Sequence, residues 1–199
     1  MTHTYDAIYH DIIDCLTAAL DAKDIYTSGH STRVADTSCA LGSLLGLKER
    51  DLECLHIAAH LHDIGKIGVP DHIIHKNGRL TENEWILMKE HTLIGYNILK
   101  KADSLKSIAQ IILHHHENYN GSGYPHKLKD EEIPFNSRII AVCDSIDAML
   151  TDRPYRKKLS YNLCKQEIIK NSEIKYDPKI VKCLIEHWYT IVVYYYKQQ

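Results

Sequence analysis

Several features that would place a protein in a specialised class are missing from this sequence. Its six cysteines lie at least 15 residues apart, so there is no CxxC pair of the kind that binds zinc or forms a redox site. No apolar run approaches the roughly 18 residues of a membrane span. The N-terminal stretch also lacks the uninterrupted apolar segment of a signal peptide. These absences predict a cytoplasmic protein with reduced thiols and no membrane association.

The sequence also lacks a strong charge of either sign. Lysine and arginine number 24 against 26 aspartates and glutamates, which gives a formal net charge of −2. Such a chain has no overall attraction for a nucleic-acid polymer or an anionic membrane surface. A small anionic substrate held by a few local cations remains compatible with it. The composition, 44% hydrophobic and 25% charged, is typical of a soluble globular domain.

Proline is absent from the first 69 residues, and little of the chain alternates as a strand would. Apolar residues recur instead at spacings of three and four, which is typical of amphipathic helices. Thr81 and Glu84 form a capping-box pattern at the start of one of them. Helices are expected over 8–20, 29–46, 49–65, 81–101, 104–119, 137–152 and 161–172, and after Pro178, with loops over 66–80 and 120–134. The tail, 190–199, fits a helix end or a short strand. The fold class predicted for residues 1–199 is a single, standalone all-α domain of the helical-bundle type.

Histidine is unusually frequent, at fourteen residues. The stretch HHHENYNGSGYP, residues 114–125, is either a helix end followed by a glycine turn or half of a metal site. His62 and Asp63 are adjacent at another predicted helix end. Asp144 interrupts an apolar helix, where a buried acid is costly unless it is paired or bound to a cation. His30 lies at the start of another predicted helix, and His91 lies in the middle of a further one. One metal centre explains why five helices carry such groups beside their apolar faces.

These segments together resemble the HD-GYP family, the branch of the HD phosphohydrolase superfamily that degrades cyclic di-GMP. The similarity extends from DAKDIYTSGHSTRV to YDPKIV. It includes HDIGKIGVPDHII, NGRLTENEWILMKEH, HHENYNGSGYP, IPFNSRIIAVCDSIDAM and DRPYR. It implies metal ligands at His30, His62, Asp63, His91, His115, His116 and Asp144, with Asp63 bridging two ions. It implies catalytic roles for Asp63 and Lys66, and substrate contacts at Lys66, Tyr124, Asp147, Arg153 and Arg156.

The resemblance implies a phosphodiesterase that hydrolyses cyclic di-GMP to pGpG, and it leaves open whether a second hydrolysis to GMP follows. Two divalent ions would hold a bridging hydroxide that attacks phosphorus, and they would clamp the attacking and leaving oxygens. Lys66 and the arginines would stabilise the charge of the transition state. Imidazole and carboxylate ligands without thiolate favour iron or manganese, with zinc as the alternative.

Three positions depart from the family pattern. Asn120 stands where an aspartate is usual, which bears on the geometry of the loop or on support for the metal ligands. Tyr26 stands where members with a third metal carry a glutamate, so two metals are expected. Cys143 replaces a small alanine and is expected to be a core residue. His114 points about 100° away from His115 on a helix and is expected to be peripheral.

Other functions remain open from the sequence. Another cyclic dinucleotide could be the substrate, because guanine specificity depends on details of the pocket. A catalytically weak or inactive binding module is the alternative from another class. It would bind cyclic dinucleotides, or partners such as GGDEF-type diguanylate cyclases. A mononucleotide hydrolase is disfavoured by the GYP and DRPYR motifs. The oligomeric state is left open.

Overall fold

The computed structural model describes residues 2–24, 29–152 and 157–196. The predicted all-α fold is confirmed, since these ranges contain helices and no β-strand. The α-helices are α1 (Thr2–Lys23), α2 (His30–Leu44), α3 (Glu49–Leu61), α4 (Asp71–Ile74), α5 (Glu82–Lys89), α6 (His91–Leu99), α7 (Lys106–Leu113), α8 (Phe135–Leu150), α9 (Tyr161–Lys170), α10 (Pro178–Glu186) and α11 (Trp188–Tyr196). Short 3-10 helices are η1 (Ile64–Gly68), η2 (Asp103–Leu105) and η3 (Asp130–Glu132).

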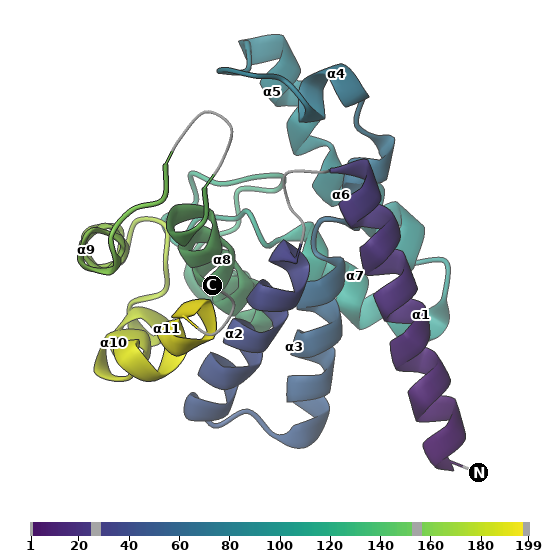
Figure 1. Ribbon diagram of the computed structural model, residues 1–199, viewed down its shortest axis with the longest axis horizontal. Helices are drawn as coiled ribbons and strands as arrows, with labels where there is room; N and C mark the ends of the chain where they lie inside the picture. Colours follow the sequence, from purple (N-terminus) through teal and green to yellow (C-terminus); the bar gives the residue numbers. More distant parts are fainter. Residues whose placement is uncertain (1, 25–28, 153–156, 197–199) are drawn as a thin grey trace.

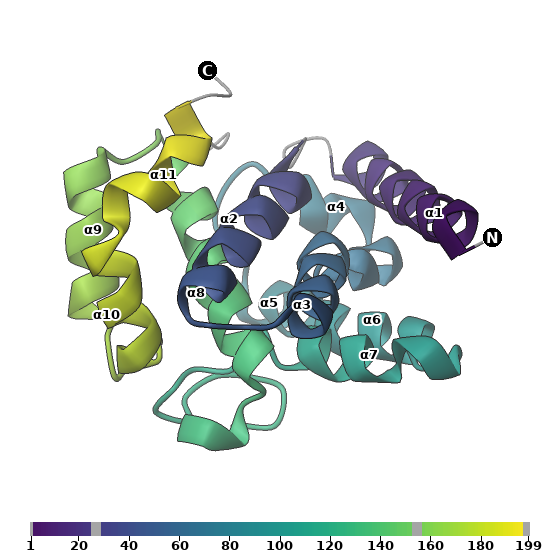
Figure 2. The ribbon, with the colours of Figure 1, turned by 90° about the horizontal axis from the view of Figure 1, so that it is seen from below.

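Helices α2, α3 and α8 pack together in the middle of the molecule. Helices α6 and α7 lie on one side of them and α9 to α11 on the other, while α1 lies along the outside (Figures 1 and 2). One apolar core runs through this arrangement and includes Leu41, Leu55, Ile112, Ile140 and Ile146, all with essentially no exposed surface. Burying such side chains is the main source of the stability of the fold. No helix in the described ranges is long and apolar enough to cross a bilayer.

The segment 81–101, expected as one helix, is two. The capping box at its start is confirmed, with Thr81 Oγ1 accepting from Glu84 N and Glu84 Oε2 accepting from Thr81 N. The helix then tightens at Glu90, whose N–H bonds to the carbonyl of Leu87, three residues back. Helix α6 packs against α7 and η1, whereas α5 has no buried residue. Packing of α6 therefore sets the break and makes His91 the first residue of a helix.

Other boundaries also differ from the sequence expectation. Helix α3 ends at Leu61 and continues as η1, and the expected loop over 66–80 includes α4. Helix α7 ends at Leu113, so the histidines at 115 and 116 lie in the turn that follows it. The tail forms α11, a helix, as far as it is described. Helices α3 and α7 thus end shortly before the buried side chains of His62 and His115.

Candidate metal centre

The side chains predicted as metal ligands lie close together, although five separate parts of the chain supply them. They are His30 at the start of α2, His62 and Asp63 after α3, His91 at the start of α6, His115 and His116 after α7, and Asp144 within α8. All but Asp144 sit at the end of a helix or in the turn beside it. A side chain at such an end can turn inward without disturbing the helix, so several helices can share one centre.

One group of ligand atoms is formed by His30, His62 and Asp144. His30 Nε2 lies 3.3 Å from His62 Nε2 and 3.4 Å from Asp144 Oδ1. One ligand atom from each of the three lies within 4.8 Å of the others. This spacing suits three ligands of a single ion.

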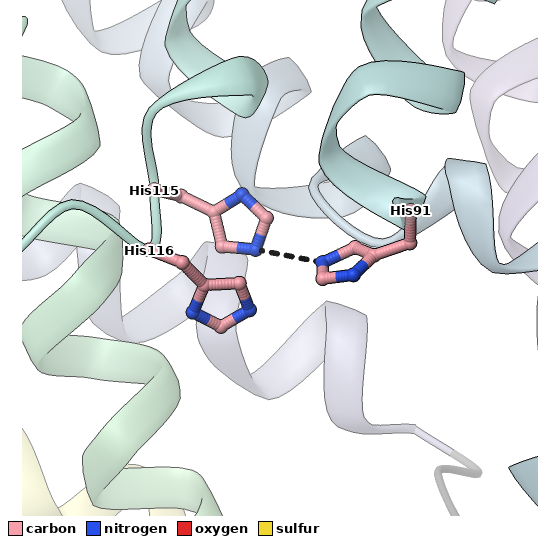
Figure 3. Close-up of side chains that lie close together, drawn as sticks. All are labelled: His91, His115 and His116. Atoms are coloured by element: carbon pink, nitrogen blue, oxygen red, sulfur yellow. Dashed lines mark hydrogen bonds between the residues drawn. The ribbon is translucent and has the colours of Figure 1, made fainter. Parts of the chain in front are cut away.

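A second group is formed by His91, His115 and His116, whose rings Figure 3 shows turned toward one another. Their ligand atoms also lie within 4.8 Å of one another, and the Nε2 atoms of His91 and His115 are 3.5 Å apart. His91 and His115 are buried, so ordinary solvent contact does not satisfy these nitrogens.

Asp63 lies between the two groups. Its Oδ2 is 3.4 Å from His62 Nε2, and its Oδ1 is 3.5 Å from His91 Nε2. Each carboxylate oxygen thus faces a different histidine group. A carboxylate in this position can bind two ions at once, as the predicted bridging role requires.

Hydrogen bonds fix which nitrogen of the central histidines is free. The Nδ1 atoms of His62, His91 and His115 each contact a backbone carbonyl oxygen. The carbonyls are those of Ala59, Met88 and Ile112, at 2.7, 2.8 and 2.6 Å. A carbonyl only accepts, so each Nδ1 carries a hydrogen, and in the neutral form of each ring the lone pair of Nε2 points inward. Lone pairs this close repel one another unless a cation lies between them. The donor set therefore fits divalent metal ions.

Burial and neighbouring charges together set the charge of these ligands. Burial lowers the pKa of His91 and His115, and it lowers the pKa of His116 to about 3. These rings are neutral at pH 7 and able to bind a metal. Burial would raise the pKa of Asp63, but Lys66 and His62 outweigh it and hold that pKa well below its usual value. Burial also opposes the charge of His62, yet Asp63 raises its pKa to about 9. A proton and a metal ion therefore compete for His62.

Lys66 extends the centre toward a substrate. Its Nζ lies 2.8 Å from Asp63 Oδ2 and 3.2 Å from Oδ2 of Asp24, a buried residue after α1. Burial disfavours the charge, but the two carboxylates outweigh it and raise the pKa of Lys66. Asp24 was not predicted from the sequence, because an acid just after an amphipathic helix looks like a solvated one.

The loop after α7 brings Tyr124 to the same place. The ring centroids of Tyr124 and His116 lie 5.0 Å apart. The backbone N–H of Tyr124 donates a hydrogen bond to the backbone carbonyl of His116. Burial raises the pKa of Tyr124, so its hydroxyl stays protonated and can donate a hydrogen bond. Buried Glu117, also missed, accepts from His126 N at 2.7 Å and so ties the loop. His114 faces His126 instead of the metal ligands.

Two of the three departures from the family pattern lie in the described part of the chain. Asn120 is exposed, and its Oδ1 accepts from Ser122 N at 3.0 Å, a contact that an aspartate could make equally. Cys143 lies in the core, where burial raises the pKa of its thiol to about 12. Tyr26, Arg153 and Arg156 lie outside the described residues.

Asp147, predicted as a substrate contact, lies against two side chains of α2. Asp147 is 1% exposed; it accepts from His30 Nδ1 at 2.6 Å and from Arg33 Nε at 2.6 Å. Burial would raise its pKa, but these two hydrogen bonds outweigh it and lower the pKa of the carboxyl. Asp147 therefore lies behind His30 and orients that ring toward the ligand cluster.

Replacing Asp147 with asparagine is expected to weaken metal binding by about 10- to 100-fold, the usual effect of removing a carboxylate that orients a ligand histidine. The free energy of unfolding should fall by about 3 kcal/mol, because the guanidinium of Arg33 loses a buried carboxylate partner. Competition with a metal-sensitive dye and thermal unfolding measure the two effects. Asp103→Asn is the matched control, since Asp103 pairs with Lys106 on the exposed surface. Metal affinity equal to that of the unmodified chain would contradict the positioning role.

The cluster opens into a pocket of about 830 Å³, a size typical of small-molecule sites. Residues from the metal-ligand cluster, Lys66 and Tyr124 line it, and so does a wall formed by residues 73–88. The pocket thus connects the candidate metal ions with a surface large enough to hold a nucleotide.

Comparison with known proteins finds an HD domain and relatives named as cyclic-dinucleotide phosphodiesterases. A family model described as "HD domain" matches residues 14–180. The chain is 39% identical, over 92% of its length and 50% of the relative, to a cyclic di-GMP phosphodiesterase of Thermotoga maritima. It is 35% identical to 3'3'-cGAMP-specific phosphodiesterase 2 of Vibrio cholerae, over 89% of its length and 34% of the relative. The chain therefore spans about a third to a half of the length of these relatives.

Solved structures share the fold. A cyclic GMP-AMP phosphodiesterase of V. cholerae aligns with a TM-score of 0.68 at 22% identity, covering 88% of this chain and 47% of that one. The HD domain of the L. monocytogenes phosphodiesterase PgpH, in complex with cyclic-di-AMP, aligns with a TM-score of 0.64 at 21% identity. That alignment covers 89% of this chain and 93% of that one.

Proposed function

The chain belongs to the HD domain family, and from this premise we propose that it is a metal-dependent phosphodiesterase that hydrolyses cyclic di-GMP to pGpG. The observation that carries the proposal is the position of Asp63, whose two carboxylate oxygens face two separate histidine groups. This arrangement lies at the base of a pocket of nucleotide size. Relatives named as cyclic di-GMP phosphodiesterases support the choice of substrate.

We propose two divalent cations, iron or manganese, as the cofactors. The ligands are imidazoles and carboxylates without a thiolate, which suits these metals better than copper. When bound, the ions would activate a water and neutralise charge on the scissile phosphate. His30, His62 and Asp144 would hold one ion, His91, His115 and His116 the other, and Asp63 both.

The residues around the ligands would hold the phosphate. Lys66 keeps its charge and lines the pocket, so its ammonium can bind a phosphate oxygen. The protonated hydroxyl of Tyr124 can donate a hydrogen bond to another phosphate oxygen. Water adds to phosphorus and the bond to the 3' oxygen breaks, which leaves a terminal 5' phosphate and a free 3' hydroxyl. The cations and these donors stabilise the extra negative charge at phosphorus.

Anaerobic purification followed by metal analysis and a hydrolysis assay tests the proposal. We expect two ions per chain and conversion of cyclic di-GMP to pGpG. Activity should disappear with a chelator and return with manganese or iron. Failure to bind any metal would overturn the assignment of the centre. Two bound ions together with cyclic di-GMP binding, but without turnover, would show a binding module instead.

Cyclic GMP-AMP is the second candidate substrate. Relatives at 35% identity are named as specific for 3'3'-cGAMP, close to the identity of those named for cyclic di-GMP. The same assay run with both dinucleotides under equal conditions decides between them by their ratio of kcat/KM.

A further inference from the structure

The pocket extends well beyond the metal ligands. Residues 73–88, from α4 to α5, form an additional wall that includes Leu80, Trp85 and Met88. Figure 1 shows α4 and α5 projecting from the helical bundle. A phosphate held by the metal ions and Lys66 would leave the rest of a nucleotide to meet this wall.

Polar contacts, rather than core packing, hold the α5 part of this wall in place, whereas Ile73 of α4 is buried. Helix α5 has no buried residue, and its start is fixed by the capping box between Thr81 and Glu84. Lys76 Nζ contacts Glu84 Oε2 at 2.5 Å and ties the preceding segment to the helix. The indole of Trp85 therefore has no place in the core and is 49% exposed where it lines the pocket.

The apolar side chains of α5 differ in what they face. Ile86 is 53% exposed, about as much as Trp85, but it does not line the pocket. Met88, one turn after Trp85, does line it. The pocket thus receives one face of α5, and that face carries its aromatic residue.

The wall also carries a cation that has no partner among the described residues. Lys66 is paired with Asp63 and Asp24, and Lys76 is paired with Glu84. Arg79 lines the pocket too, and within the described part of the chain it makes no ion pair or hydrogen bond. Its guanidinium is therefore available to a ligand.

We propose that Trp85 and Arg79 form a purine-binding subsite, with the indole stacking on a base and the guanidinium donating to its edge. Aromatic rings are general platforms for unstacked bases. Arginine can donate two hydrogen bonds to O6 and N7 of guanine, whereas adenine presents an amino donor in place of O6. The subsite therefore selects guanine. This inference rests on the proposed function, because it assumes that a phosphate of the same ligand lies at the metal centre.

Trp85→Ala should raise KM for cyclic di-GMP, measured with manganese, by roughly 5- to 100-fold, while kcat changes little. Trp85→Phe should keep most of the affinity, because a smaller ring still stacks. Ile86→Ala is the matched control and should behave as the unmodified chain. Equilibrium dialysis of a hydrolysis-resistant phosphorothioate analogue of cyclic di-GMP with manganese-loaded protein gives the affinity independently of turnover.

The outcomes separate the subsite from the enzyme. Turnover in the unmodified chain with unchanged KM in Trp85→Ala would overturn the subsite and leave the proposed function standing. If the chain binds cyclic di-GMP without turnover, and Trp85→Ala weakens this binding whereas Ile86→Ala does not, the subsite would be supported and the proposed function overturned. A chain that neither binds nor hydrolyses cyclic di-GMP would overturn both.

The guanidinium has its own test, in which cyclic di-AMP is the comparison ligand. Arg79→Ala should lower affinity for cyclic di-GMP by roughly 5- to 100-fold and affinity for cyclic di-AMP much less. Arg79→Lys should lose most of the preference for guanine while keeping the positive charge. Equal losses for both dinucleotides would show attraction to phosphate only and would overturn base recognition by Arg79.

Discussion

Asp63→Asn is expected to abolish hydrolysis of cyclic di-GMP and to reduce bound metal from two ions per chain to at most one. In the unmodified chain, the two carboxylate oxygens of Asp63 lie 3.4 Å from His62 Nε2 and 3.5 Å from His91 Nε2, so this one residue serves both groups of histidine ligands. An amide offers one weak oxygen ligand and no negative charge. We expect turnover to fall by at least about 10³-fold, equivalent to about 4 kcal/mol of transition-state stabilisation.

Metal analysis and single-turnover assays of the same preparation measure the two effects of Asp63→Asn. Asn120→Asp is a suitable control in the neighbouring loop, since either side chain can accept from Ser122 N. Its activity should stay within about threefold of that of the unmodified chain, because exposed substitutions usually change little. Two firmly bound ions in Asp63→Asn would show that Asp63 does not bridge them.

Gly65→Ala is expected to disrupt the centre without touching any ligand side chain. A β-carbon at Gly65 would lie 1.8 Å from the carbonyl oxygen of His91 and 2.5 Å from Gly95 N. Both obstacles are backbone atoms, so η1 and α6 must move apart. That movement separates Asp63 from His91. Overpacking of this kind costs about 3 kcal/mol or more, which lowers the unfolding midpoint by roughly 6–12 °C.

Thermal unfolding with and without metal measures the effect at Gly65. Gly68→Ala in the same 3-10 helix is the control, because there the nearest atoms, at 3.0 and 3.1 Å, belong to the side chain of Ile94. That side chain can shift, so the expected loss is smaller. A Gly65→Ala protein with normal stability and two bound ions would mean that η1 and α6 do not need this close approach.

The two substitutions test different requirements of the centre. Asp63 supplies charge and ligand atoms, whereas Gly65 allows two backbones to come close enough for those atoms to meet. Loss of metal in both, with loss of stability mainly in Gly65→Ala, would separate coordination from packing.

The sequence by itself determined which residue types could form the centre and which segments contain most of the helices. Spacings of three and four identified the helices, because only one face of each meets the core. The Thr81 and Glu84 pattern placed the start of α5 correctly, since that hydrogen bonding is local. The HD and GYP motifs singled out residues that the fold then brings within a few ångströms.

Only the tertiary structure decided how these residues are oriented and supported. His91 heads a helix because α6 must pack on α7 and η1, a contact that no local pattern records. Asp147 lies behind His30, and Asp24 reaches Lys66 across 42 residues of sequence. Trp85 lines the pocket because α5 projects from the bundle. Each of these positions depends on how helices that are distant in the sequence lie relative to one another. Packing of the whole core fixes that arrangement.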